Sequence, residues 1–112
     1  MELLITQRLH VDEAKVVGYL LSHSNGQGKA AFFLRFGFLP GAWAEMAEAL
    51  KQQARNNPVV TAVDSPYGTR YSVDGELQTP SGRVPRVRTI WILESGSDQL
   101  RLITAYPIQE AP

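Results

Sequence analysis

The segment from His23 to Lys29 contains the two residues of this sequence best suited to acid–base and phosphate chemistry. Gly26 and Gly28 lie between them, and a helical pattern follows. Backbone N–H groups at the start of a helix are free to bind an anion. A cation in the first turn opposes the helix dipole by roughly 0.3–1 kcal/mol, so Lys29 is better explained if it and His23 meet a phosphate or a carboxylate. The alternative is that Lys29 points into water.

Three arginines form a second candidate site, because no acidic residue separates Arg83, Arg86 and Arg88. Arg86 and Arg88 are two residues apart, so on a strand they share one face. Guanidinium groups bind phosphate in a forked geometry, which makes this cluster a candidate substrate-binding patch. The alternative is a solvated strand start whose arginines pair with Asp74 or Glu76 across the sheet.

Two hydroxyl residues, Thr104 and Tyr106, form a third candidate site near the end of the chain. They continue the alternation of Leu100 and Leu102, which predicts that all four side chains share one face of a strand. The two hydroxyls then either complete the edge of the core or line a cleft. Spacing alone favours the core edge, with Tyr106 hydrogen-bonded at its rim.

The sequence offers little for metal or cofactor chemistry. It has no Cys, and its two His residues stand apart from any cluster of Asp and Glu. We therefore expect no metal site and no cofactor. His10 has no partner nearby in the sequence and is interpreted as structural. Tyr67, in the turn Pro66-Tyr67-Gly68, is a weak candidate for stacking on a nucleic-acid base.

Length and composition indicate one small globular domain over residues 1–112. Apolar residues make up 44%, and eleven Lys and Arg balance eleven Asp and Glu. The zero net charge argues against a polybasic nucleic-acid binder, although a local basic patch is compatible with it. Apolar stretches are too short to span a bilayer, and the first residues do not resemble a secretion signal. The expectation is a cytoplasmic protein without a membrane partner.

Hydrophobic periodicity predicts an α+β fold. Helical patterns cover residues 13–22 and 28–36, and a third helix opens at Pro40-Gly41 and ends at Asn56-Asn57-Pro58. Two-fold alternation or continuous apolar runs then mark strands near 59–63, 71–77, 87–93 and 100–106. We expect two to three N-terminal helices, within about 12–57, packed on one face of a roughly four-stranded antiparallel sheet, within about 58–107.

A set of short motifs, taken together, resembles a bacterial domain family of unknown function. The resemblance runs from about Leu9 to Pro107 and is specific only as a set. Its residues are Lys15, Tyr19-Leu20-Leu21, His23, Gly28-Lys29-Ala30, Phe32-Phe33, Gly37-Phe38, Tyr71, Gly75, Leu77, Thr79-Pro80, Gly82-Arg83, Trp91-Ile92, Leu102 and Thr104-Ala105-Tyr106-Pro107. More distantly, the upstream His and the closing Thr-Ala-Tyr-Pro are similar to bacterial toxin ribonucleases of the barnase, EndoU, colicin and RelE type.

The second resemblance implies metal-independent cleavage of RNA by attack of the 2′-hydroxyl. It would make His23 the acid or base, Lys29 and Arg83 the cations, and Thr104 and Tyr106 the residues that position the phosphate. Arg86 and Arg88 would add substrate contacts, and a neutralising protein would be needed in the producing cell. Many such nucleases use two His in the site and are basic, whereas His10 has no place in this site and the net charge of this chain is zero. The alternative is a non-catalytic module of the same fold that binds a protein or nucleic acid.

Overall fold

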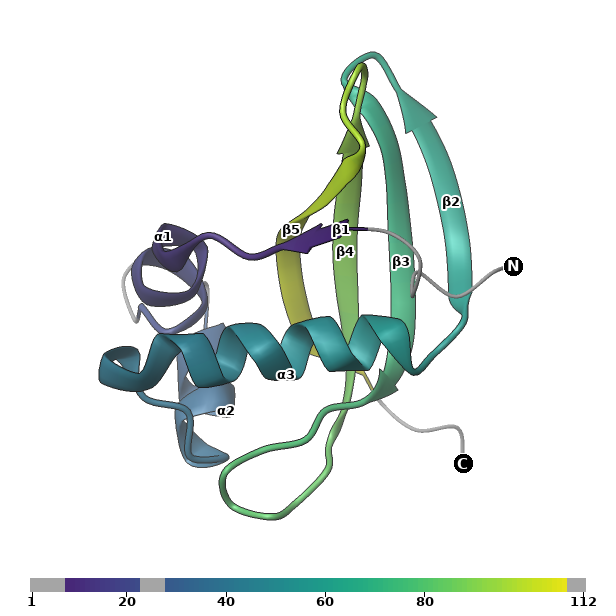
Figure 1. Ribbon diagram of the computed structural model, residues 1–112. Helices are drawn as coiled ribbons and strands as arrows, with labels where there is room; N and C mark the ends of the chain where they lie inside the picture. Colours follow the sequence, from purple (N-terminus) through teal and green to yellow (C-terminus); the bar gives the residue numbers. More distant parts are fainter. Residues whose placement is uncertain (1–7, 23–27, 109–112) are drawn as a thin grey trace.

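The structure, a computed structural model, describes residues 8–22 and 28–108 and places three helices around a five-stranded sheet (Figure 1). The helical elements are α1 (Glu13–Lys15), the π-helical turn η2 (Val16–Leu20), α2 (Lys29–Arg35), the 3₁₀ turn η3 (Pro40–Ala42) and α3 (Trp43–Arg55). The strands are β1 (Arg8–His10), β2 (Val59–Ser65), β3 (Gly68–Glu76), β4 (Arg86–Glu94) and β5 (Gln99–Pro107). The predicted α+β class is confirmed.

The sheet has the order β1-β5-β4-β3-β2 and is mixed. Strands β2 to β5 form the antiparallel meander that the sequence predicts, and β4 is its centre. The addition is β1, which pairs in parallel with the start of β5. A strand of three residues is too short to show a two-fold period, which is why the predicted count of roughly four strands becomes five.

Helix α3 lies across one face of the sheet and closes the main core (Figure 1). Its apolar stripe buries Met46, Leu50 and Ala54, as the helical spacing predicts. Across from them, Val73 of β3 and Trp91 of β4 are fully buried. The core is therefore a two-layer contact between one amphipathic helix and the middle of the sheet.

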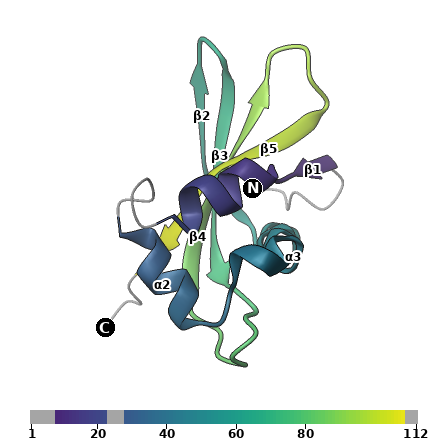
Figure 2. The ribbon, with the colours of Figure 1, turned by 90° about the vertical axis from the view of Figure 1, so that its left-hand side faces the viewer.

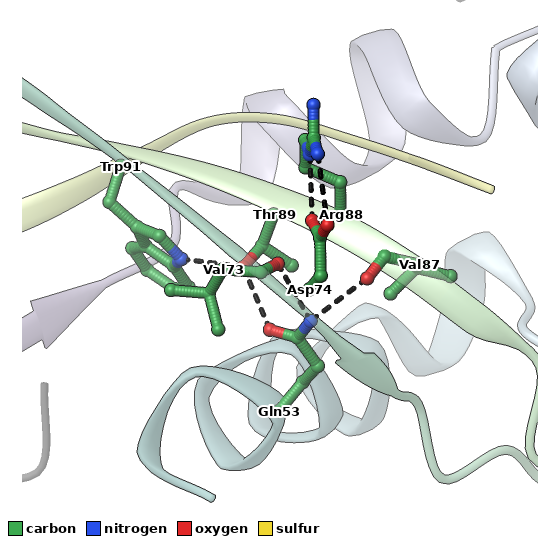
Figure 3. Close-up of polar contacts among 7 residues, drawn as sticks. All are labelled: Gln53, Val73, Asp74, Val87, Arg88, Thr89 and Trp91. Atoms are coloured by element: carbon green, nitrogen blue, oxygen red, sulfur yellow. Dashed lines mark hydrogen bonds and ion pairs between the residues drawn. The ribbon is translucent and has the colours of Figure 1, made fainter. Parts of the chain in front are cut away.

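A buried polar network ties α3 to the two middle strands (Figure 3). The amide of Gln53 donates to the carbonyls of Val73 and Val87, both at 3.0 Å. Its oxygen accepts from the Thr89 hydroxyl at 2.8 Å, and that hydroxyl in turn accepts from the Trp91 indole at 2.8 Å. Because each polar atom in this core has a partner, the network sets how α3 lies on the sheet.

The predicted helix over 13–22 is shorter than expected and changes character. Asp12 is its N-cap residue but makes no side-chain cap bond, because its carboxylate contacts His10 instead. The turn η2 buries Val16 and Leu20 completely. Tyr19, which is also part of η2, points its side chain toward α2, where its hydroxyl meets Lys29.

Helix α2 packs beside η2 at the β5 edge of the sheet, and Figure 2 shows it on the other side of α1 from α3. It buries Ala30 and Phe33 and ends at Gly37, whose φ of 98° is the left-handed stop that the sequence predicts. In the sequence, Ser24 and Gln27 have the spacing of a capping box for this helix, and both lie outside the described residues. The helices therefore cover one face of the sheet and its β5 edge. The middle of the other face, where Arg88 lies, stays open and is called the open face below.

Candidate functional site

The first residue of α2 and the turn η2 meet at a lysine–tyrosine contact. Lys29 Nζ donates to the phenolic oxygen of Tyr19 at 3.2 Å. The ammonium groups of Lys15 and Lys29 also lie 4.9 and 5.2 Å from the centre of the Tyr19 ring. Both distances suit cation–π attraction. The alternative interpretation, in which Lys29 simply points into water, is therefore wrong.

These contacts lower the pKa of Tyr19 below its ordinary value of 10.0. The hydrogen bond from Lys29 is the largest cause, and the nearby Thr104 hydroxyl is the second. The positive charges of Lys29 and Lys15 add to the lowering, while partial burial opposes it. The phenol of Tyr19 therefore loses its proton at lower pH than the phenol of an isolated tyrosine does.

The predicted face of the last strand is wrong for the two hydroxyl residues. Leu102 pairs with Trp91, but Thr104 pairs with Ile90, because a β-bulge gives β5 one extra residue at Ile103. One extra residue reverses the alternation, so Leu102 faces the core and Thr104 faces the opposite side. Tyr106 follows Thr104 onto this open face, which removes the core-edge interpretation.

Thr104 Oγ1 is buried and has no hydrogen-bond partner of good geometry among the described residues. It is nevertheless close enough to the phenol of Tyr19 to affect its pKa. A buried hydroxyl without a full partner is uncommon in native proteins. Here it lies beside the Lys29–Tyr19 contact, where a ligand oxygen would be able to complete its bonding.

A row of polar residues crosses the open face next to Thr104. Asp74, Arg88 and Tyr106 are directly opposite one another on β3, β4 and β5. Arg88 donates to both carboxylate oxygens of Asp74, at 2.6 and 2.9 Å (Figure 3). The pKa of Arg88 is raised, first by Asp74 and then by Tyr106. Arg88 therefore makes the cross-strand pair that the second interpretation of the arginine cluster describes.

The structure separates the three arginines. Arg86 begins β4 and is half-buried opposite Glu76, two residues from Arg88 on the same face. Arg83 is exposed in the loop between β3 and β4, where its backbone N–H donates to the Ser81 hydroxyl at 3.3 Å. The three cations are not one patch, because only Arg86 and Arg88 lie on the open face.

Lys29 and Tyr106 line the same open pocket, of about 360 Å³, together with Gly28, Phe32 and Pro107. The pocket lies where the start of α2 meets the end of β5. His23 is the remaining residue of the predicted site, and it lies outside the described residues. Among the others, the structure brings Lys29, Thr104 and Tyr106 to one region and adds Tyr19 to them.

The sequence pattern did not single out Tyr19 as a chemical residue. Tyr19 is on an apolar helical segment ten residues before Lys29, and no spacing rule connects the two. Asp74 appeared only as a possible partner for the arginines. Within the described ranges, no cluster of three or more His, Asp or Glu is arranged to hold a metal ion. No helix in those ranges is long and apolar enough to cross a membrane.

Fold and site together define a small α+β domain with an open pocket, lined by Lys29 and Tyr106, at the β5 side of an open sheet face. The chain belongs to the family described as Domain of unknown function (DUF6883), whose model matches residues 3–109. The predicted membership of a family of unknown function is thereby confirmed.

One solved structure shares the fold over most of the chain. It is titled as a contact-dependent growth inhibition toxin–immunity protein complex from Klebsiella pneumoniae 342. The TM-score is 0.70 at 20% sequence identity, and the match covers 88% of this chain and 98% of that chain. A likeness at this level of identity shows a common fold.

A curated relative matches a shorter segment. The probable nicotinate-nucleotide adenylyltransferase of Erythrobacter litoralis (strain HTCC2594) is 46% identical over 50 residues. The match covers 44% of this chain and 22% of that protein. The matched segment thus spans less than a quarter of that relative.

Proposed function

We propose that this domain is a metal-independent, toxin-like ribonuclease. Its site would combine the pocket lined by Lys29 and Tyr106 with the neighbouring Tyr19 and Thr104. The observation that carries the proposal is the Lys29–Tyr19 hydrogen bond at 3.2 Å, at the edge of a pocket that Tyr106 also lines. The fold shared with a chain of a growth-inhibition toxin–immunity complex supports the toxin class. The proposed setting is the cytoplasm, where RNA is available.

The reaction requires two proton transfers and stabilisation of negative charge. A base removes the proton of a 2′-hydroxyl, and that oxygen forms a bond to the adjacent phosphorus. The bond from phosphorus to the 5′-oxygen then breaks, and an acid supplies the proton for the leaving 5′-oxygen. The products are a 2′,3′-cyclic phosphate and a free 5′-hydroxyl, and no redox partner or metal ion enters the balance.

Tyr19 and Lys29 suit two of these tasks. The phenolic oxygen of Tyr19 accepts a hydrogen bond from Lys29, and its lowered pKa makes the phenolate easier to form. That phenolate would be the proton acceptor. An ammonium group has three donors, so Lys29 keeps two for a phosphate oxygen while it holds Tyr19. Its charge would stabilise the pentacovalent intermediate. His23 keeps its sequence-based assignment as the second proton-transfer group.

The remaining residues would hold the substrate. Thr104 Oγ1 is buried and lacks a full hydrogen bond among the described residues, so it would donate to a phosphate oxygen. Tyr106 would do the same from the pocket wall, with Arg88 and Asp74 fixing its place on the sheet. Arg86 and Arg83 would contact more distant phosphates. A toxin of this kind needs a neutralising protein in the cell that makes it, and such a partner is part of the proposal.

The test is cleavage of total RNA and of tRNA in the presence of EDTA. We expect wild type to cut, and Lys29→Met, Tyr19→Phe and His23→Ala to cut at least about 100-fold more slowly. Lys51→Met is the matched control, because it removes a lysine from α3 on the other side of the sheet, and it should keep wild-type activity. Cutting that EDTA abolishes, or that all three site variants retain, would contradict the proposal.

A non-catalytic binding module is the second candidate function. It is favoured by one observation: the charge of Arg88 is already matched by Asp74, with side chains 34% and 18% exposed. Such a pair holds the sheet together and leaves less free charge for phosphate. If wild type does not cut RNA at several pH values and high protein concentration, this candidate replaces the ribonuclease. A stable complex with a protein or nucleic acid, isolated by pull-down, would then identify its ligand.

A further inference from the structure

A second open pocket, of about 320 Å³, lies on the same sheet face as the proposed site. Its floor is the row formed by Arg70, Ile92 and Arg101, which are directly opposite one another on β3, β4 and β5. Along β4 this row is four residues from Arg88. Because a strand rises about 3.3 Å per residue, the two rows are separated by about 13 Å.

Lys15 connects the two pockets. It lines the second pocket, and its ammonium lies 4.9 Å from the centre of the Tyr19 ring. The hydroxyl of that ring bonds Lys29, which lines the first pocket. A continuous line of cationic and aromatic groups therefore runs from one pocket to the other along the η2 side of the open face.

The second pocket carries a net positive charge in a chain that is neutral as a whole. Three cations line it, namely Lys15, Arg70 and Arg101, against one carboxylate, Glu94, which leaves a net charge of +2. Glu94 is hydrogen-bonded to Arg101 at 3.1 Å. Lys15 and Arg70 form no ion pair with any residue that the structure describes. Their charges are available to an anionic ligand.

Tyr67 contributes an aromatic ring to this pocket and is 75% exposed. Tyr67 lies in the turn between β2 and β3. A hydrogen bond closes this turn, because Ser65 Oγ donates to the carbonyl of Gly68 at 2.7 Å. An exposed ring on an ordered turn beside unpaired cations has the composition of a site for single-stranded nucleic acid. Such sites combine base stacking with contacts to the phosphates.

We propose that the second pocket binds nucleotides of single-stranded RNA that flank the cleaved bond, with Tyr67 stacking on a base and Lys15 and Arg70 contacting phosphates. The inference rests on the proposed ribonuclease function and names its substrate as an unpaired strand of several nucleotides. A duplex does not fit, because its bases are stacked on each other and cannot reach Tyr67. A dinucleotide would fill the first pocket without reaching the second.

Binding can be measured separately from cleavage with fluorescein-labelled single-stranded RNA whose 2′-hydroxyls are methylated, so that the 2′-oxygen cannot attack. We expect Tyr67→Ala to weaken binding of a strand of about 10 nucleotides by about tenfold in fluorescence anisotropy, because one base loses its stacking partner. Tyr67→Phe should bind like wild type. Arg70→Ala should weaken binding and reduce the slope of log affinity against log salt by about 0.7.

The controls separate this inference from the proposed function. Arg55→Ala removes an arginine from α3, on the other face, and should not change affinity. Loss of binding in the Tyr67 and Arg70 variants supports the second pocket even if wild type does not cut RNA. Equal binding by Tyr67→Ala, Arg70→Ala and wild type would overturn it even if Lys29→Met abolishes cleavage. Equally tight binding of a duplex of the same sequence would overturn it as well.

Discussion

The ammonium of Lys29 lies 3.2 Å from the phenolic oxygen of Tyr19, although ten residues separate them in the sequence. The contact joins the start of α2 to the turn η2 beside the open sheet face. It explains how a lysine is accommodated in the first turn of a helix, where its charge opposes the helix dipole. The lysine is held by an oxygen and an aromatic ring rather than by a helix carbonyl.

Lys29→Met should raise the pKa of Tyr19 toward 10.0, because the hydrogen bond from Lys29 is the largest cause of its lowering. Lys15→Met should raise the pKa by less, since Lys15 acts only through its charge. The measurement is an alkaline titration of phenolate absorbance, with Tyr19→Phe used to assign the signal. An unchanged titration in Lys29→Met would contradict the contact.

The same contact makes stability depend on pH in a definite direction. A native-state pKa below the unfolded value means that the unfolded state binds more protons between the two, so stability rises with pH in that window. The gain is complete above about 10 and is lost as pH falls through the lowered pKa of Tyr19. The difference in unfolding free energy between wild type and Tyr19→Phe, measured in urea, should therefore grow as pH rises through the lowered pKa toward about 10. A difference that varies instead between pH 5 and 7 would point to another group.

Gln53→Met should lower the free energy of unfolding by about 2–3 kcal/mol. The substitution keeps the volume of the side chain but leaves the Thr89 hydroxyl without its acceptor and removes the donor to two buried carbonyls. Gln52→Met is the matched control, because Gln52 is exposed and bonds only Glu48 among the contacts described, and it should change stability by less than about 0.5 kcal/mol. Equal effects in urea denaturation would mean that the buried network contributes nothing.

Asp74→Asn should cost about 1–2 kcal/mol, because one oxygen of the two-bond pair with Arg88 is replaced by a donor that faces a donor. Asp98→Asn provides the comparison. Asp98 pairs with Arg8 across side chains that are 80% and 70% exposed, and such pairs contribute about 0–1 kcal/mol. Thermal unfolding at moderate salt would rank the two variants, and a larger loss for Asp98→Asn would refute the importance of the Arg88 pair.

Gly68→Ala should destabilise the β2–β3 hairpin by at least about 2 kcal/mol. Gly68 has a φ of 137°, and a Cβ atom there would overlap the backbone of Leu93 and Glu94 on β4. Gly41→Ala meets no atom within 4 Å and should be close to neutral. Chemical denaturation of both variants checks this. If the two were equally stable, the close approach of β3 and β4 at Gly68 would not be required.

Local pattern was enough to predict most of the secondary structure. The stripe of Met46, Leu50 and Ala54 predicts α3, and Gly37 marks the end of α2 with its left-handed φ. The apolar run of residues 87–93 predicts the central strand. Each of these signals arises within a few residues, where helix and strand periods differ most clearly.

The candidate site was predicted only in part. The chemical types of Lys29, Thr104 and Tyr106 were enough to select them as candidates. The position of Thr104 and Tyr106 on the open face does not follow from the alternation of residues along the strand. The bulge at Ile103 reverses their side, and it arises from the pairing of β5 with β4. Tyr19 has no motif of its own, so its contact with Lys29 appears only when η2 and α2 pack together.

Local sequence pattern predicts the helices, the four antiparallel strands β2 to β5, the α+β class and the residue types capable of chemistry, but not the short strand β1. Those properties depend on local backbone preferences and on apolar spacing, which a chain carries before it folds. Only tertiary contacts establish which sheet face carries the hydroxyls of Thr104 and Tyr106. The same holds for the pairing of Arg88 with Asp74 and for the contact of Lys29 with Tyr19. These outcomes depend on strand register and helix packing, which are set by contacts between residues far apart in the chain, and no local period encodes them.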